Sequence, residues 1–182
     1  DHRMIARKAA EDSCVLLKNE GVLPFTTDIK HVAIIGPFAD SQNIMGWWRA
    51  IGDSEDCVSL KTGIENLLGD QVLVTGLEAC GFNDSELEDF EKIKDLVNKA
   101  DVVILALGEE QDMCGEAGSR GFIDLPGRQE ELAQKVLDQN KPCAVVLFNG
   151  RPLTLDWLDH HASGILEAWY PGTEGGNAIA NI

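Results

Sequence analysis

The sequence predicts an α/β domain in which a mostly parallel sheet is covered by helices on both faces, a three-layer α/β/α sandwich. Short apolar runs alternate with amphipathic segments along the chain, a pattern typical of strand–helix–strand units. The runs show little apolar–polar alternation, which indicates strands buried on both faces. A chain of 182 residues fits one such domain, so we expect residues 1–182 to form a single unit.

The amino-terminal segment is expected to be a helix. Apolar residues recur in it with a period close to 3.6, and Asp1 stands at its start as a candidate N-cap. The same periodicity reaches Cys14 and Leu17, so the predicted helix continues to the breakers Gly21 and Pro24.

The later elements follow from apolar runs and from the turn residues between them. Each expected strand is a short run such as HVAIIG or CAVVLF, and each expected helix has an apolar face and a capping residue or glycine at an end. Strands are expected near residues 31–36, 71–75, 102–107, 143–148 and 164–169, with helices over 59–68 and 85–100, before Asn140 and at the end of the sequence.

The loop after the central strand is the first candidate functional site. The strand 102–107 ends at Gly108, and the polar segment GEEQDMCGEAGSR follows it. Functional loops of parallel sheets lie at the carboxyl ends of the strands. Carboxylates and an arginine in such a loop suit sugar chemistry, while a solvated acidic loop is the competing interpretation. The polar residues of this loop are Glu109, Glu110, Asp112, Glu116, Ser119 and Arg120.

The loop after the strand 31–36 is the second candidate. Its sequence GPFADS lacks the glycine spacing G-x-G-x-x-G, so nucleotide binding is not expected. Trp47 and Arg49 follow, and an indole beside a guanidinium can stack on a sugar ring and bond its hydroxyls. Burial of the tryptophan in the core is the alternative.

Composition excludes several classes of partner. A formal net charge of -16 repels phosphate backbones and anionic lipid, so neither nucleic acid nor membrane is expected as a partner. Five widely spaced cysteines predict free thiols and a reducing, cytoplasmic compartment, with a secreted or periplasmic location as the alternative. The adjacent His160 and His161 do not converge on one point, so we expect no metal site and no cofactor.

Five segments together resemble a known family. They are AR-KAA-EDS-CVLLKNEGVLPF, HVAIIGPFAD, GEEQDMCGEAGSR, NGRPL and ILEAWYPGTEGGNAIANI, which occur in this order over nearly the whole chain. In combination they resemble the second, α/β-sandwich domain of family 3 glycoside hydrolases, the β-glucosidase group. The resemblance implies a retaining hydrolase of β-glucosides or oligosaccharides, without a cofactor. Its first domain is a (β/α)8 barrel that carries an aspartate nucleophile.

The resemblance also assigns roles to residues of this chain. Glu116 falls where many members place the acid/base glutamate, and Glu109 is its rival. Ser119, Arg120, Trp47 and Arg49 are then candidate substrate-binding residues. Three further residues either border the pocket or cap strand ends, namely Asn149, Arg151 and Glu174.

On this interpretation the chain is one domain of a longer enzyme and is inactive alone. We expect the barrel before it and a fibronectin-like domain after it to be missing from the sequence. The alternative function is a non-catalytic carbohydrate-binding or regulatory module, which needs the Trp47 and Arg49 platform but no proton donor.

Overall fold

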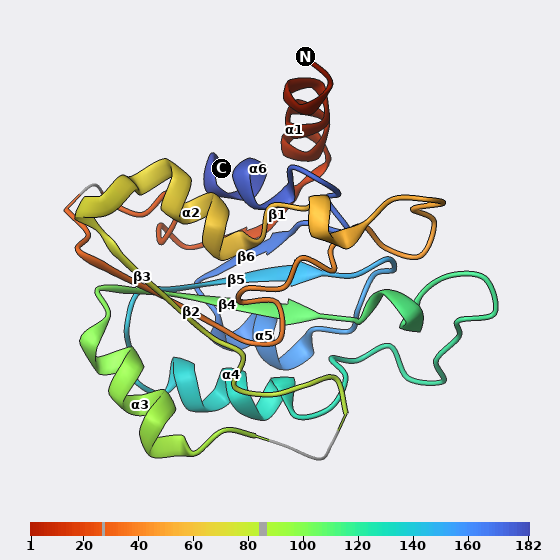
Figure 1. Cartoon of the computed structure of the whole chain (residues 1–182). Helices are drawn as coiled ribbons and strands as arrows, with labels where there is room; N and C mark the ends of the chain where they lie inside the picture. Colours follow the sequence, from red (N-terminus) through yellow and green to blue (C-terminus); the bar gives the residue numbers. More distant parts are fainter. Residues whose placement is uncertain (27, 84–86) are drawn as a thin grey trace.

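The sheet has six strands in the order β1-β6-β5-β4-β2-β3 (Figure 1). The computed structural model describes residues 1–26, 28–83 and 87–182. Strands β2 to β6 are all parallel to one another, and β1 pairs antiparallel with β6 at one edge. The expected mostly parallel sheet is therefore confirmed. The strands are β1 (Val15–Asn19), β2 (His31–Ile35), β3 (Leu73–Leu77), β4 (Val102–Gly108), β5 (Cys143–Phe148) and β6 (Gly164–Glu167).

Helices cover both faces of this sheet (Figure 1). One face carries α2 (Leu60–Leu68) and α6 (Gly175–Ala180), and the other carries α3 (Phe90–Lys99), α4 (Gln129–Leu137) and α5 (Asp156–His161). Side chains of β4 alternate between the two apolar layers, because successive strand residues point to opposite faces. Val103 and Leu105 belong to the cluster under α3 and α4, whereas Ile104 and Ala106 belong to the cluster under α2 and α6. The three-layer sandwich expected from the sequence is confirmed.

The amino-terminal helix is shorter than predicted. Helix α1 (His2–Ser13) begins at the N-cap Asp1 as expected, but Cys14 is already extended, with φ -64° and ψ 145°. Residues Val15–Asn19 then form β1 on the edge of β6, with Val15 opposite Glu167. The prediction of helix up to Gly21 was wrong because pairing with a distant strand overrides a weak local period.

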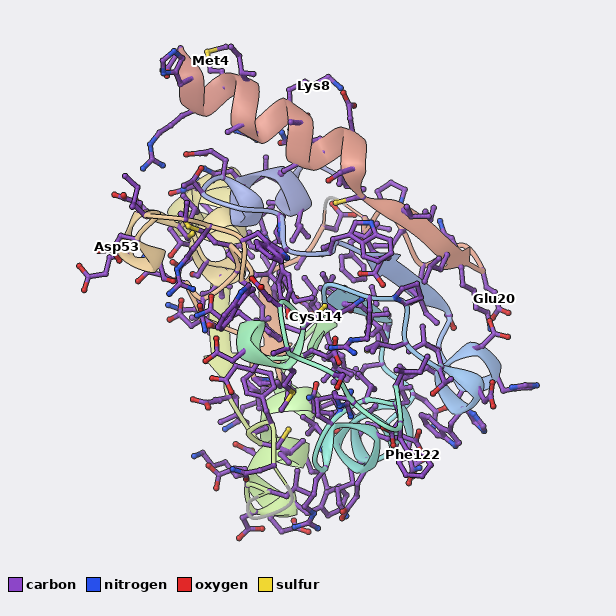
Figure 2. The ribbon with its side chains drawn as sticks, turned by 90° about the vertical axis from the view of Figure 1, so that its right-hand side faces the viewer. Met4, Lys8, Glu20, Asp53, Cys114 and Phe122 are labelled. Atoms are coloured by element: carbon purple, nitrogen blue, oxygen red, sulfur yellow. The ribbon has the colours of Figure 1, made fainter. Side chains whose placement is uncertain are left out.

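Helix α1 stands away from the body of the domain (Figures 1 and 2). It contacts α6, and Arg3 reaches from it to Glu174 with a 2.5 Å ion pair. Met4 and Lys8 point away from the domain in Figure 2. Among the described residues, no helix combines the length and apolar character that crossing a bilayer requires.

The carboxyl ends of β2, β4, β5 and β6 lie together on one side of the sheet, on the right of Figure 1. This side is called the carboxyl edge, as distinct from the outer strand β1. Both candidate loops, after β2 and after β4, emerge there. This arrangement follows from the parallel topology and places residues that are far apart in the sequence on one surface.

Candidate functional site

Figure 2 views the domain from the carboxyl ends of the parallel strands, with Cys114 near the centre of that surface. The surface is built from four connections. They are the loop after β2 that holds Trp47 and Arg49, the loop 109–120 after β4, the turn 149–151 after β5, and residues 168–170 after β6.

Glu109 is the first residue after β4 and is completely buried. Its backbone N–H donates to the Phe148 carbonyl at 2.8 Å, which continues the β4–β5 ladder. Arg120 Nη1 donates to Glu109 Oε1 at 2.9 Å, and Arg151 Nε donates to Glu109 Oε2 at 3.1 Å. Each carboxylate oxygen therefore has its own guanidinium, and the buried charge is compensated.

Glu116 has the opposite environment. It is exposed, and among the described residues no hydrogen bond or ion pair engages its carboxylate. It lies in a tight turn in which Gly115 and Gly118 form an isolated bridge and Ala117 has φ +62°. A non-glycine residue with positive φ is uncommon, and such residues concentrate at functional sites. The turn presents Glu116 to the outside.

Trp47 and Arg49 lie against this loop, so the loops after β2 and β4 meet. A Cβ added at Gly115 would stand 2.7 Å from Trp47 Cβ and Cδ1, so only glycine permits this approach of the turn to the indole. Arg49 Nη1 donates to the side-chain oxygen of Gln111. Trp47 is 45% exposed, which leaves much of its surface open to a ligand.

The remaining candidates have different positions. Arg120 is bound to Glu109 and to Asp124, whereas Ser119 is exposed. Arg151, which the sequence left open as pocket neighbour or strand cap, faces Glu109. Asn149 is buried, and its Nδ2 donates to the Arg151 carbonyl at 2.8 Å and to Glu167 Oε2 at 2.9 Å.

Glu174 does not join this group through any described contact. It accepts hydrogen bonds from Asn177 and from Arg3, at 2.7 Å and 2.5 Å, near the start of α6. Although burial acts to raise it, these bonds and the charge of Arg3 hold the pKa of Glu174 below its ordinary value. Glu174 is therefore a structural link between α1 and α6.

Two residues of this edge were missed by the sequence reasoning. The Tyr170 hydroxyl lies 3.0 Å from the Glu109 carbonyl and 3.1 Å from the Glu110 carbonyl, to which it donates. Burial, and then the charge of Glu109, raise the pKa of Tyr170, so it remains a donor. Glu167 accepts from the N–H of Trp169, a residue with φ +57°, and burial raises the pKa of Glu167. The available signal was their position at the end of the last strand, since Glu167 is its final residue and Tyr170 follows three positions later.

No ligand set for a metal is visible at this edge. Among the described residues, no group of three histidine, cysteine or acidic side chains converges. His160 and His161 are exposed on α5, where their Nδ1 atoms contact the carbonyls of Asp156 and Trp157. The chemistry that the edge offers is the exposed carboxyl groups of Glu116 and Asp112, an indole and several guanidinium donors. Such a set can donate a proton and bind hydroxyls.

The fold and this edge together define an α/β domain that gathers exposed carboxylates, arginines and an indole at the ends of its parallel strands. Residues 14–182 match the family described as the glycosyl hydrolase family 3 C-terminal domain. The chain therefore belongs to the C-terminal domain family of the family 3 glycosyl hydrolases, as its sequence segments indicated.

Named relatives agree with this assignment. The chain is 38% identical over 203 residues to the periplasmic beta-glucosidase of Salmonella typhimurium, covering 100% of this chain and 26% of the relative. It is 33% identical over 189 residues to the beta-xylosidase of Formosa agariphila, with the same coverage of 100% and 26%. The β-glucosidase of Listeria innocua, solved in complex with isofagomine, matches 97% of this chain with 24% of its own, at TM-score 0.86 and 38% identity. The chain spans about a quarter of the length of these relatives.

Proposed function

We propose that this chain is the second domain of a retaining β-glucosidase that closes an active site shared with a (β/α)8 barrel. The exposure of Glu116 on a held turn, next to the half-exposed Trp47, carries the proposal. A retaining glycosidase needs two carboxyl groups about 5 to 5.5 Å apart, one as nucleophile and one as acid/base. We assign Glu116 as the acid/base and place the nucleophile on the barrel.

The surroundings of Glu116 agree with a role that is completed by another domain. A carboxylic acid that donates a proton near neutral pH needs a dry pocket with a second carboxylate nearby. Glu116 is exposed, so the barrel has to supply that pocket. Trp47, Arg49, Ser119 and Arg120 are the proposed substrate-binding residues on this side.

The choice of substrate follows the relatives. Those with 38% identity are named β-glucosidases, whereas the Formosa relative at 33% is named a β-xylosidase. We therefore propose a β-glucoside as the substrate. Free thiols at all five cysteines fit the predicted cytoplasmic location, and the periplasmic name of the Salmonella relative supports the alternative location.

The test is made in a protein that carries this domain together with its barrel. Glu116→Gln should slow the cleavage of β-glucosides with poor leaving groups by about 10²- to 10⁴-fold, because these depend on proton donation. Activated aryl β-glucosides should lose much less. Asp112→Asn is the matched control, since Asp112 is an exposed carboxylate of the same loop.

Three other outcomes decide between the proposed function and its alternatives. Equal losses on both kinds of substrate, or none, would remove the acid/base role from Glu116. The 182-residue chain alone should not hydrolyse an aryl β-glucoside; turnover by it would refute a shared site. Sugar binding without any catalytic effect of Glu116→Gln would favour a carbohydrate-binding module.

A further inference from the structure

Two carboxylates of the same loop, Glu109 and Glu116, have opposite environments. Glu109 is 0% exposed, and both of its oxygens accept from guanidinium groups. A proton donor must reach the glycosidic oxygen within about 2.6 to 3.2 Å. The Glu109 carboxylate is enclosed by Arg120 and Arg151 and has no open side for a substrate.

The two arginines also hold the backbone around Glu116. Arg151 Nη2 donates to the carbonyl of Met113 and, at 3.2 Å, to that of Gly118. These carbonyls flank Glu116 on both sides of the turn. One guanidinium therefore connects the buried Glu109 with both ends of the turn that presents Glu116.

The second arginine fixes the end of the loop. Arg120 Nη1 donates to Glu109 Oε1 and also to the Asp124 carbonyl, at 2.9 Å and 2.8 Å. The side chains of Arg120 and Arg151 are each only 19% exposed, so neither guanidinium is free to exchange its partners for water without moving the loop.

We infer that Glu109 is a positioning residue and not the proton donor: its carboxylate orders Arg120 and Arg151, and these fix the turn that holds Glu116. This inference rests on the proposed function, because it assigns the part that the rival carboxylate plays in the same site. Glu109 itself is attached to β4 and β5, and both strands are buried along their whole length. The position of Glu116 is thereby fixed relative to the buried strands of the sheet.

Glu109→Gln tests this, because the amide replaces one carboxylate oxygen by an NH2 donor, which cannot accept a hydrogen bond from the guanidinium that it faces. A displacement of a catalytic group by about 1 Å costs on the order of 10²-fold in rate. We therefore expect Glu109→Gln to slow cleavage of a poor-leaving-group β-glucoside by about 10²-fold in kcat, with a smaller change in KM. Arg7→Lys is the control, since Arg7 forms a surface pair with Glu11 on α1.

The double variant Glu109→Gln/Glu116→Gln separates positioning from an independent role. If Glu109 acts through Glu116, the double variant should be no slower than Glu116→Gln alone, within about 3-fold, because interacting sites are not additive. If the rate losses of the two single variants multiply in the double variant, the inference is overturned. Azide should accelerate the turnover of an activated aryl glucoside by Glu116→Ala, because it attacks the glycosyl-enzyme in place of water without a general base, releasing the carboxylate nucleophile and a glycosyl azide. It should not accelerate turnover by Glu109→Ala. Rescue of Glu109→Ala would make Glu109 the donor.

Arg151→Lys provides a second route if Glu109→Gln does not fold. A lysine keeps the charge next to Glu109 but has no planar fork to reach the carbonyls of Met113 and Gly118. Amide exchange of residues 113–118 should become faster while that of β4 and β5 is unchanged, with the same leaving-group-dependent loss. Unchanged exchange and unchanged rates in Arg151→Lys would overturn the inference.

The failure of the proposed function gives a different result. In that case Glu116→Gln has no effect on rates, whereas Arg151→Lys still accelerates exchange of residues 113–118. Failure of the proposed function is seen in the rates of Glu116→Gln, whereas failure of the inference is seen in the amide exchange of Arg151→Lys, so the two failures can be distinguished.

Discussion

The crossing of α2 and α6 allows one stability prediction to be worked out from the structure. The two helices approach each other at Gly63 and Gly176, both buried. A Cβ added at Gly63 would overlap the carbonyl group of Gly176 and lie 2.7 Å from the backbone nitrogen of Asn177. Backbone atoms cannot rotate away, so Gly63→Ala should force the helices apart and loosen the apolar layer beneath them.

The magnitude is the difference between two effects. Overpacking a well-filled interior costs about 1 to 3 kcal/mol, and a clash with backbone belongs near the upper limit. Alanine gains about 1 kcal/mol over glycine inside a helix. The net loss should be about 2 kcal/mol in the free energy of unfolding. At roughly 2 to 4 °C per kcal/mol for a chain of this size, the melting temperature should fall by about 4 to 8 °C.

Urea and thermal unfolding of the chain, followed by tryptophan fluorescence and circular dichroism, measure this loss. Gly81→Ala is the control, since a Cβ there would have nothing within 4 Å and the backbone has no positive φ. It should be neutral or slightly stabilising. A Gly63→Ala chain as stable as the wild type would refute the reasoning that the helix crossing depends on these glycines.

Three further predictions concern charge and the site. Because burial raises the pKa of Glu167, the folded chain holds this proton more tightly, and wild-type stability should fall relative to Glu167→Gln as pH rises from about 4.5 to 7; a difference independent of pH would contradict this. Because the pKa of Glu174 is held down, Arg3→Ala should lower the unfolding midpoint at pH 7 and have a smaller effect in acid, where the carboxylate is protonated in both states and only the bond from Arg3 to the Asp56 carbonyl is lost; an equal loss at both pH values would rule out the ion pair as its cause. Gly115→Ala should displace the Trp47 indole, seen as a shift in tryptophan emission, and raise KM more than it lowers kcat in a barrel-containing protein; an unchanged emission spectrum would show that the contact is absent.

Much of the fold could be predicted from local patterns. The apolar run of β4 is buried at every position, so the pattern that indicated a strand covered on both faces reflects the real environment. Strand β1 and helix α5 could not be predicted in this way. The register of β1 depends on Gly164–Glu167, about 150 positions away in the sequence, and the six residues of α5 are too few to display a period.

The candidate site was predictable to the level of the loop and not of the residue. Parallel topology alone indicates that the loops after β2 and β4 meet, and Trp47 does contact Gly115. The sequence could not distinguish Glu109 from Glu116, because the difference between them is made by Arg151, 42 positions after Glu109. Whether a carboxylate is buried depends on the tertiary structure. It can be recognised only when the residue that compensates its charge is known.

The different environments of the two carboxylates agree with the proposed role of Glu116 as a proton donor at a domain surface. A donor that must meet a substrate carried by another domain has to remain exposed, so its own carboxylate cannot be fixed by buried partners. Ordering a turn costs about 1 to 2 kcal/mol per residue in backbone entropy, and an exposed side chain repays none of it. The neighbouring carboxylate can be buried without loss of function, and ion pairs with two guanidinium groups make that burial stable. Placing Glu109 at the end of β4, with Arg151 bridging it to the carbonyls on both sides of Glu116, thus fixes the position of an exposed group by contacts that the group itself does not make.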